Sequence, residues 1–133
     1  MAKAFLSHSS KDKEIVRKVA TQLGNKNSVL DEISFEPGTR TLEQIFSELE
    51  SSDIFVLFIS DSSLDSPWVK KEINRAKSHL SEDIIDRIIP IIIDENVKYS
   101  DPRIPKWIGK SYNKKKKKNE VIILNKIRQA LKE

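Results

Sequence analysis

The stretch that decides the fold runs from Asp53 to Glu72 and reads DIFVLFISDSSLDSPWVKKE. Its first part, Ile54–Ile59, is a continuous apolar run with no alternation between apolar and polar positions. A strand of this kind is buried on both faces, as strands are in the centre of a parallel sheet. The polar residues 60–63 predict a loop at its end, and a second element is predicted to begin near Ser66.

That second element is a helix. Ser66 can cap it, and Pro67 suits the first turn, where a missing N–H costs nothing. Its buried stripe is predicted to be Val69, Ile73, Ala76 and Leu80. Trp68 and Glu72 are four residues apart, so they share one face on the flank of that stripe. A carboxylate there, half sheltered by an indole, is a candidate functional group. The alternative is a rim glutamate that pairs with a basic neighbour or with solvent.

Strands alternate with helices along the rest of the chain. Further strands are predicted at 3–7, 28–31 and 88–93, and further helices from Ser9 or Ser10 to Leu23, at 41–49 and at 120–132. Pro90 indicates that the start of the last strand lies off the central ladder. This alternation is typical of βαβ units. We expect one α/β domain over 1–133, a flavodoxin-like three-layer sandwich with a mostly parallel sheet of about five strands and helices on both faces.

Composition restricts the possible functions. The absence of cysteine excludes disulfides, thiolate zinc sites and a cysteine nucleophile. His8 and His79 are too few for a histidine metal site, and we expect no metal. Three glycines cannot form GxGxxG, which argues against a Rossmann dinucleotide site. Since the chain shows no apolar segment long enough to span a bilayer and no signal peptide, we expect a cytoplasmic location and no membrane partner.

The formal charge is +4, and the run Lys114–Lys118 accounts for it, so the rest of the chain is close to neutral. Such a run could contact nucleic acid. However, Tyr112 is its one flanking aromatic residue, and blocks of like charge are usually solvated. We therefore do not expect nucleic-acid binding.

Polar residues follow the predicted strands where a parallel sheet forms its ligand crevice, beyond the carboxyl ends. Ser7, His8 and Ser9 follow the first strand and could contact ribose or phosphate, or could instead cap the first helix. Nothing in the sequence orients His8 as a general base. Asp31 follows the second strand, and ordering of its loop is its more plausible role. His79 shares the flank of the Glu72 helix but is expected at the surface.

These residues together resemble the Toll/interleukin-1 receptor (TIR) domain in its bacterial form. The segment 4–12, AFLSHSSKD, is similar to the first box of the family, and Asp31 lies where the second strand commonly ends. Pro37-Gly38 falls at the position of the BB loop. The pairing of 53–60 with 66–72 is the most specific part. The resemblance covers the whole chain and weakens after about Asp94.

The resemblance implies that the domain cleaves NAD⁺, as a substrate and not a cofactor, at the nicotinamide–ribose bond. Glu72 corresponds to the catalytic glutamate of the family's Trp-x-x-x-Glu pattern. Candidate substrate-binding residues are Phe5, Ser7, His8, Ser9, Asp31, Arg40 and Trp68, and the interaction loop contains Glu36, Pro37 and Gly38. One carboxylate suffices, because nicotinamide leaves from a cationic pyridinium and needs no acid, unlike the leaving group of an ordinary glycoside.

The resemblance also implies self-association with other TIR domains, activation by clustering, and a role in antiviral defence or signalling. The alternative is a non-catalytic TIR scaffold that binds other TIR domains through the loop 32–41, since fold does not imply function. A receiver domain lacks support because Ser7-His8 stands where an acidic pair would be needed. Nucleoside deoxyribosyl transfer is a minor alternative. Hydrolysis and cyclisation to a cyclic ADP-ribose both stay open.

Overall fold

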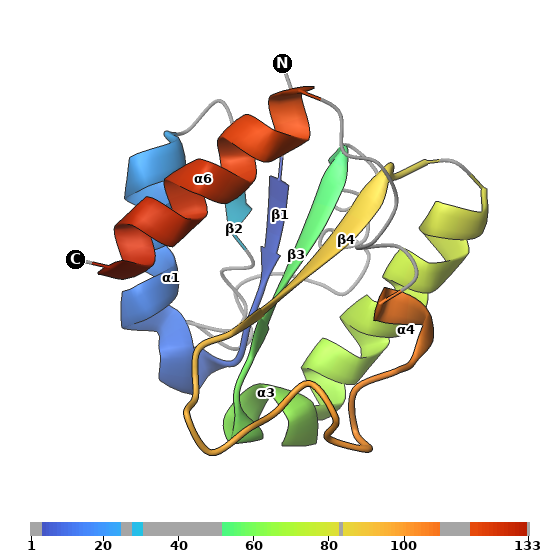
Figure 1. The fold of residues 1–133 in the computed structure, drawn as a ribbon. Helices are drawn as coiled ribbons and strands as arrows, with labels where there is room; N and C mark the ends of the chain where they lie inside the picture. The colour runs from blue at the N-terminus through green and yellow to red at the C-terminus, as the bar shows by residue number, and fades with distance from the viewer. Residues whose placement is uncertain (1–3, 25–27, 31–51, 83, 110–117, 133) are drawn as a thin grey trace.

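The computed structural model describes residues 4–24, 28–30, 52–82, 84–109 and 118–132 (Figure 1). The strands are β1 (Ala4–Ser7), β2 (Ser28–Leu30), β3 (Ile54–Ile59) and β4 (Arg87–Ile92). The helices are the 3-10 helix η1 (Ser10–Asp12) and the α-helices α1 (Lys13–Leu23), α3 (Asp61–Asp65), α4 (Pro67–Ser81) and α6 (Lys118–Lys132). The helix predicted at 41–49 lies outside the described residues.

The strands form one parallel sheet in the order β2-β1-β3-β4. Phe5 in β1 is aligned with Val29 of β2 on one side and with Phe55 of β3 on the other. This order corresponds to the first four strands of the 2-1-3-4-5 arrangement of doubly wound sheets. The α/β class and the parallel sheet are therefore confirmed. About five strands were predicted, and the part of the chain that the structure describes supplies four.

Helices cover both faces of the sheet, with α4 on one face and α1 and α6 on the other (Figure 1). All six side chains of β3 are buried, as its continuous apolar run predicted. Phe55, Leu57 and Ile59 belong to the α4 core, and Ile54, Val56 and Phe58 belong to the α1/α6 core. The rings of Phe5 and Phe55 stack with centroids 5.7 Å apart on the α4 side. One short strand thus contributes side chains to both hydrophobic cores.

The predicted start of α4 is confirmed. The Ser66 hydroxyl accepts a hydrogen bond from the Val69 N–H at 3.3 Å, and Pro67 occupies the first turn. Val69, Ile73 and Ala76 are buried as predicted. Leu80 is partly buried and packs against the same core.

The loop predicted at 60–63 is wrong, because α3 begins there. The Ser60 hydroxyl accepts from the Ser63 N–H at 3.1 Å, and the Ser63 hydroxyl accepts from the Ser60 N–H at 2.9 Å. Serine at both positions completes a reciprocal capping box, whose usual form has Glu or Gln at the second position. The Ser60 and Ser63 side chains therefore stabilise a helix in a segment whose polar sequence is typical of a loop.

The expectation for Pro90 is also wrong. The strand β4 is paired from its first residue, Arg87, which is aligned with Ile54, and Pro90 itself is aligned with Leu57. Within the described chain, β4 has a neighbouring strand on one side alone. A proline is tolerated at such an edge, where its missing N–H need not interrupt the ladder.

Arg103 connects the segment after β4 to α3. Its guanidinium donates to Asp61 at 2.7 Å, to Asp65 at 2.9 Å and to Asp101 at 2.9 Å. The side-chain hydrogen bonds from Arg103 lower the pKa of Asp101 to about 2. Asp94 accepts from the Asp61 N–H at 3.1 Å, and backbone N–H donors, that of Asp61 first, lower its pKa. These contacts hold the segment after β4 against the start of α3.

We predict that Arg103→Ala lowers the melting temperature by a few degrees at pH 7. Because the pKa of Asp101 is lowered by folding, the contribution of this pair is present above about pH 4 and is lost as the pH falls through about 2. The difference between the variant and the wild type should therefore shrink between pH 5 and pH 2 in thermal melts followed by circular dichroism. Lys98→Ala, on the same segment, is the control. A difference independent of pH contradicts this account.

Candidate functional site

The candidate site lies where β1 ends beside α4. Ser7 is the last residue of β1, and its hydroxyl donates to Glu72 Oε1 of α4 at 2.6 Å. Both residues are 0% exposed, although they are separated by 65 positions in the sequence. The sequence placed Glu72 on the half-sheltered flank of the helix, and the structure buries it completely.

The local sequence explains why Glu72 points inward. Ser66 and Pro67 fix where α4 begins, and Glu72 then falls between Val69 and Ile73, which both pack against the sheet. A carboxylate removed from water requires hydrogen-bond donors. The Ser7 hydroxyl supplies one at the end of β1. Ser7 is therefore both the terminal residue of a strand and a partner of the candidate catalytic group.

Trp68 lies one turn before Glu72 and is partly buried against the α4 core. The Lys71 Nζ stands 5.9 Å from the centre of its ring. The structure therefore gives Trp68 a packing role at the edge of this core. Its contact with substrate stays a prediction.

His8 is 0% exposed, and its Nδ1 lies 2.8 Å from the Leu6 carbonyl oxygen. Because a carbonyl oxygen only accepts, Nδ1 carries the proton in this contact. His8 is therefore oriented by the backbone, contrary to the expectation that nothing nearby fixes it. Ser9 caps η1 by accepting from the Lys11 N–H at 3.2 Å, which is the structural alternative considered for this segment. Contact of Ser7, His8 or Ser9 with ribose or phosphate stays a prediction.

The remaining candidates divide into two groups. Phe5 is fully buried in the core, where it stacks on Phe55, so the structure gives it a packing role, and its contact with substrate stays a prediction. The substrate-binding candidates Asp31 and Arg40 and the loop residues Glu36, Pro37 and Gly38 lie outside the described residues.

The surface position predicted for His79 is wrong, because this residue is 3% exposed. Counted from Glu72, Ala76 and His79 follow at four and seven positions, which is the spacing of one helical face. The buried stripe of α4 is thus wider than its apolar residues suggested and includes two titratable side chains. The sequence shows this spacing, but Glu72 and His79 are polar and were therefore not assigned to the buried stripe.

Sequence reasoning also missed a polar cluster beside the site. Ser60 was interpreted as part of a loop, and no partner was predicted for Asp12. In the structure, the Ser60 hydroxyl donates to Asp12 Oδ2 at 2.6 Å, and the Ser9 hydroxyl donates to the same oxygen at 3.2 Å. The three-residue spacings from Ser9 to Asp12 and from Ser60 to Ser63 were the available signals. The contact between Ser60 and Asp12 depends on the parallel alignment of β1 with β3.

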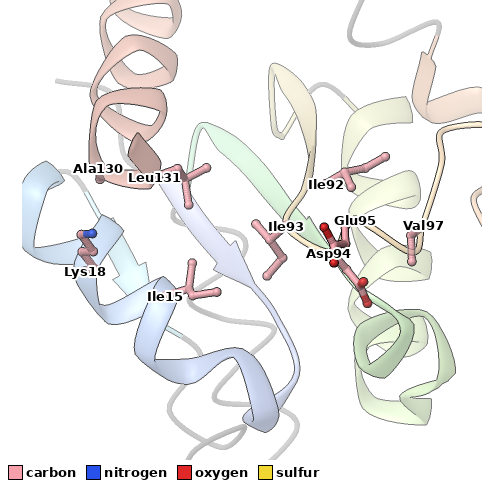
Figure 2. Close-up of a pocket in the computed structure, with 9 residues that line it drawn as sticks. All are labelled: Ile15, Lys18, Ile92, Ile93, Asp94, Glu95, Val97, Ala130 and Leu131. Carbon is pink, nitrogen blue, oxygen red and sulfur yellow. The ribbon is translucent and has the colours of Figure 1, made fainter. Parts of the chain in front are cut away.

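A cavity of about 380 Å³ lies elsewhere, on the α1/α6 side of the sheet. Figure 2 shows aliphatic side chains from α1, α6 and the end of β4 around it, including Ile15, Ile93 and Leu131. Lys18 lies on the opposite side from Asp94 (Figure 2). Neither Ser7 nor Glu72 lines this cavity, so it is separate from the candidate site.

Among the described residues, no group of three or more His, Cys, Asp or Glu side chains could hold a metal ion. No described helix is long and apolar enough to cross a membrane.

The family model of the TIR domain matches residues 4–124, from the first residue of β1 into α6. The chain belongs to the TIR-domain family. A search of the curated proteins found no match. The resemblance inferred from the sequence motifs is therefore confirmed, and the matched region of this TIR domain includes both Ser7 and Glu72.

We predict that Ser7→Ala destabilises the TIR domain, because Glu72 loses a donor to a carboxylate that water does not reach. The free energy of unfolding should fall by about 1–3 kcal/mol, measured by urea denaturation. Ser81→Ala is the matched control, because Ser81 is exposed and its hydroxyl bonds to the Lys77 carbonyl of the same helix. The control should change by less than about 0.5 kcal/mol. Equal stability of Ser7→Ala and the wild type contradicts the importance of this bond.

Proposed function

We propose that this TIR domain cleaves NAD⁺ at the nicotinamide–ribose bond, with Glu72 as the catalytic residue. The observation that carries the proposal is the 2.6 Å hydrogen bond that fixes Glu72 at the end of β1. In parallel α/β sheets, ligands bind beyond the carboxyl ends of the strands. Glu72 is also the glutamate of the Trp-x-x-x-Glu pattern, in a family that includes NAD⁺-cleaving members.

The reaction needs a single carboxylate. When the bond between ribose C1′ and the pyridinium nitrogen breaks, its electron pair neutralises the nitrogen, and nicotinamide leaves without a proton. The ribose then carries the positive charge as an oxocarbenium ion. The Glu72 carboxylate stabilises this cation or bonds to it. Water then adds to C1′ and releases a proton, giving ADP-ribose, or a nitrogen of the adenine adds instead, giving a cyclic ADP-ribose.

Ser7 suits a supporting role in this chemistry. Its hydroxyl is neutral, so the bond to Oε1 fixes the orientation of the carboxylate without cancelling its charge. Preorganised groups of this kind stabilise a transition state because they need no reorientation during the reaction. Trp68 would form a wall beside the nicotinamide ribose, and Ser7, His8, Ser9, Asp31 and Arg40 would contact the ribose and phosphate groups. NAD⁺ is then the substrate, and the reaction requires no cofactor.

The burial of Glu72 supports control by assembly. A side chain with 0% exposure does not meet a dissolved substrate until the surrounding chain rearranges. TIR domains typically associate with one another, and association of copies could select the open arrangement. The loop with Glu36, Pro37 and Gly38 is the proposed contact. Depletion of NAD⁺ upon clustering would suit antiviral defence or signalling.

The same burial supports a second candidate function, that of a non-catalytic scaffold for other TIR domains. A fully buried glutamate bonded to a strand-end serine would also serve simply to join α4 to the sheet. The two functions differ in one measurable respect, because the scaffold leaves NAD⁺ intact under clustering conditions.

We predict that the wild-type domain, at high concentration or captured densely on beads, releases nicotinamide from NAD⁺. Glu72→Gln, which keeps the shape and removes the charge, should lower the rate by about 10²–10³-fold, as should Glu72→Ala. Glu14→Gln is the matched control, because Glu14 is an exposed glutamate of α1. Nicotinamide and ADP-ribose products would be quantified by liquid chromatography, which also distinguishes hydrolysis from cyclisation.

Three outcomes separate the candidate functions. Activity that rises steeply with density and disappears in Glu72→Gln supports the enzyme. Activity that survives in a folded Glu72→Gln variant contradicts the role of this residue. If the clustered wild type leaves NAD⁺ intact, cleavage of NAD⁺ is rejected and the scaffold function is favoured.

A further inference from the structure

Asp12 connects the two chain segments that carry the two halves of the Ser7–Glu72 pair. Its Oδ2 accepts from Ser60 Oγ at 2.6 Å and from Ser9 Oγ at 3.2 Å. Ser9 lies two residues after Ser7. Ser60 directly precedes α3, which leads through Ser66 into α4 and Glu72. The Asp12 carboxylate therefore forms a second bridge between the segments that the Ser7–Glu72 bond already joins.

Each hydroxyl in this bridge is held in place by further contacts. Ser60 is 4% exposed, and its oxygen accepts from the Ser63 N–H while its proton goes to Asp12. Ser9 is 6% exposed, and its oxygen accepts from the Lys11 N–H. Hydroxyl bonds to a carboxylate are short and strong, and 2.6 Å is a typical length. The bridge therefore links the cap of η1 to the cap of α3.

We propose that Asp12 is a positioning residue for the reaction at Glu72. It fixes the turn after β1 relative to the start of α3 and so holds Ser7 and Glu72 at their bonding distance. This inference rests on the proposed cleavage of NAD⁺. Asp12 does not touch the reacting atoms in this account and acts through the placement of Glu72. Displacement of a catalytic group by 1 Å can cost roughly 10²-fold in rate. Even a small loosening of the bridge should therefore lower the rate measurably.

The geometry of the bridge allows a conservative substitution of Asp12. Both serines donate to one oxygen, Oδ2, so Asp12→Asn keeps an acceptor there through its amide oxygen. Asp12→Ala removes the acceptor altogether. Ser60→Ala removes the shorter of the two bonds. Asp65→Ala is the matched control, because Asp65 is a carboxylate of α3 that binds Arg103 on the exposed surface and takes no part in the bridge.

The first measurement is turnover of NAD⁺ by the clustered domain, at a temperature where circular dichroism shows every variant to be folded. In Asp12→Ala and Ser60→Ala we expect kcat to fall by about 10- to 100-fold with KM changed less than about threefold. Asp12→Asn should recover most of kcat, and Asp65→Ala should stay close to the wild type. A role in stability alone would leave kcat unchanged in fully folded protein.

The second measurement does not depend on activity. Amide hydrogen exchange of the segments 7–12 and 60–64 should be faster in Asp12→Ala than in the wild type, and Asp12→Asn should restore protection. Turnover by the wild type together with an unchanged kcat in Asp12→Ala overturns the positioning role alone. Unchanged exchange in Asp12→Ala overturns the bridge. A clustered wild type without turnover rejects the function on which the positioning role rests, and that role falls with it, whatever the exchange shows.

Discussion

The burial of β3 on both faces is the constraint on which the rest of the structure depends. A strand without a polar side chain must be covered on each side, so α4 packs on one face and α1 and α6 on the other. The parallel neighbours β1 and β4 then bring their carboxyl ends to the same edge as that of β3. Ser7 is the last residue of β1 and Ser60 directly follows β3, so both lie at this edge. The site is therefore a consequence of how one apolar strand is buried.

Polar contacts at this edge specify the arrangement that the apolar cores allow. Apolar packing alone would tolerate small shifts of α4 along the sheet, whereas the 2.6 Å bond from Ser7 to Glu72 sets a single position. The bond from Ser60 to Asp12 repeats this function for α3, and Arg103 adds exposed ion pairs to the same helix. The short helix α3 buries Leu64 in the α4 core, and the bond from Ser60 to Asp12 fixes its start relative to the turn after β1.

The sequence predicted what periodicity and capping control. The continuous run Ile54–Ile59 predicted the doubly buried strand, and Ser66-Pro67 predicted the start of α4. Predictions based on polarity were wrong in two places. The segment 60–63 begins a helix because Ser60 and Ser63 cap each other, and His79 is buried although its side chain is polar. The bonds from Ser60 to Asp12 and from Ser7 to Glu72 could not be predicted, because they span 48 and 65 positions and depend on a strand alignment that no local spacing encodes.

The most direct test of the central claim is a structure of the clustered domain with an NAD⁺ analogue that resists cleavage. We expect the nicotinamide ribose to lie at the carboxyl edge of the sheet beside Trp68. The Glu72 carboxylate should stand within about 3.5 Å of C1′, the distance from which a nucleophile or a stabilising charge acts. An analogue bound in the cavity lined by α1, α6 and residues 92–97, with Glu72 still enclosed, would contradict the account.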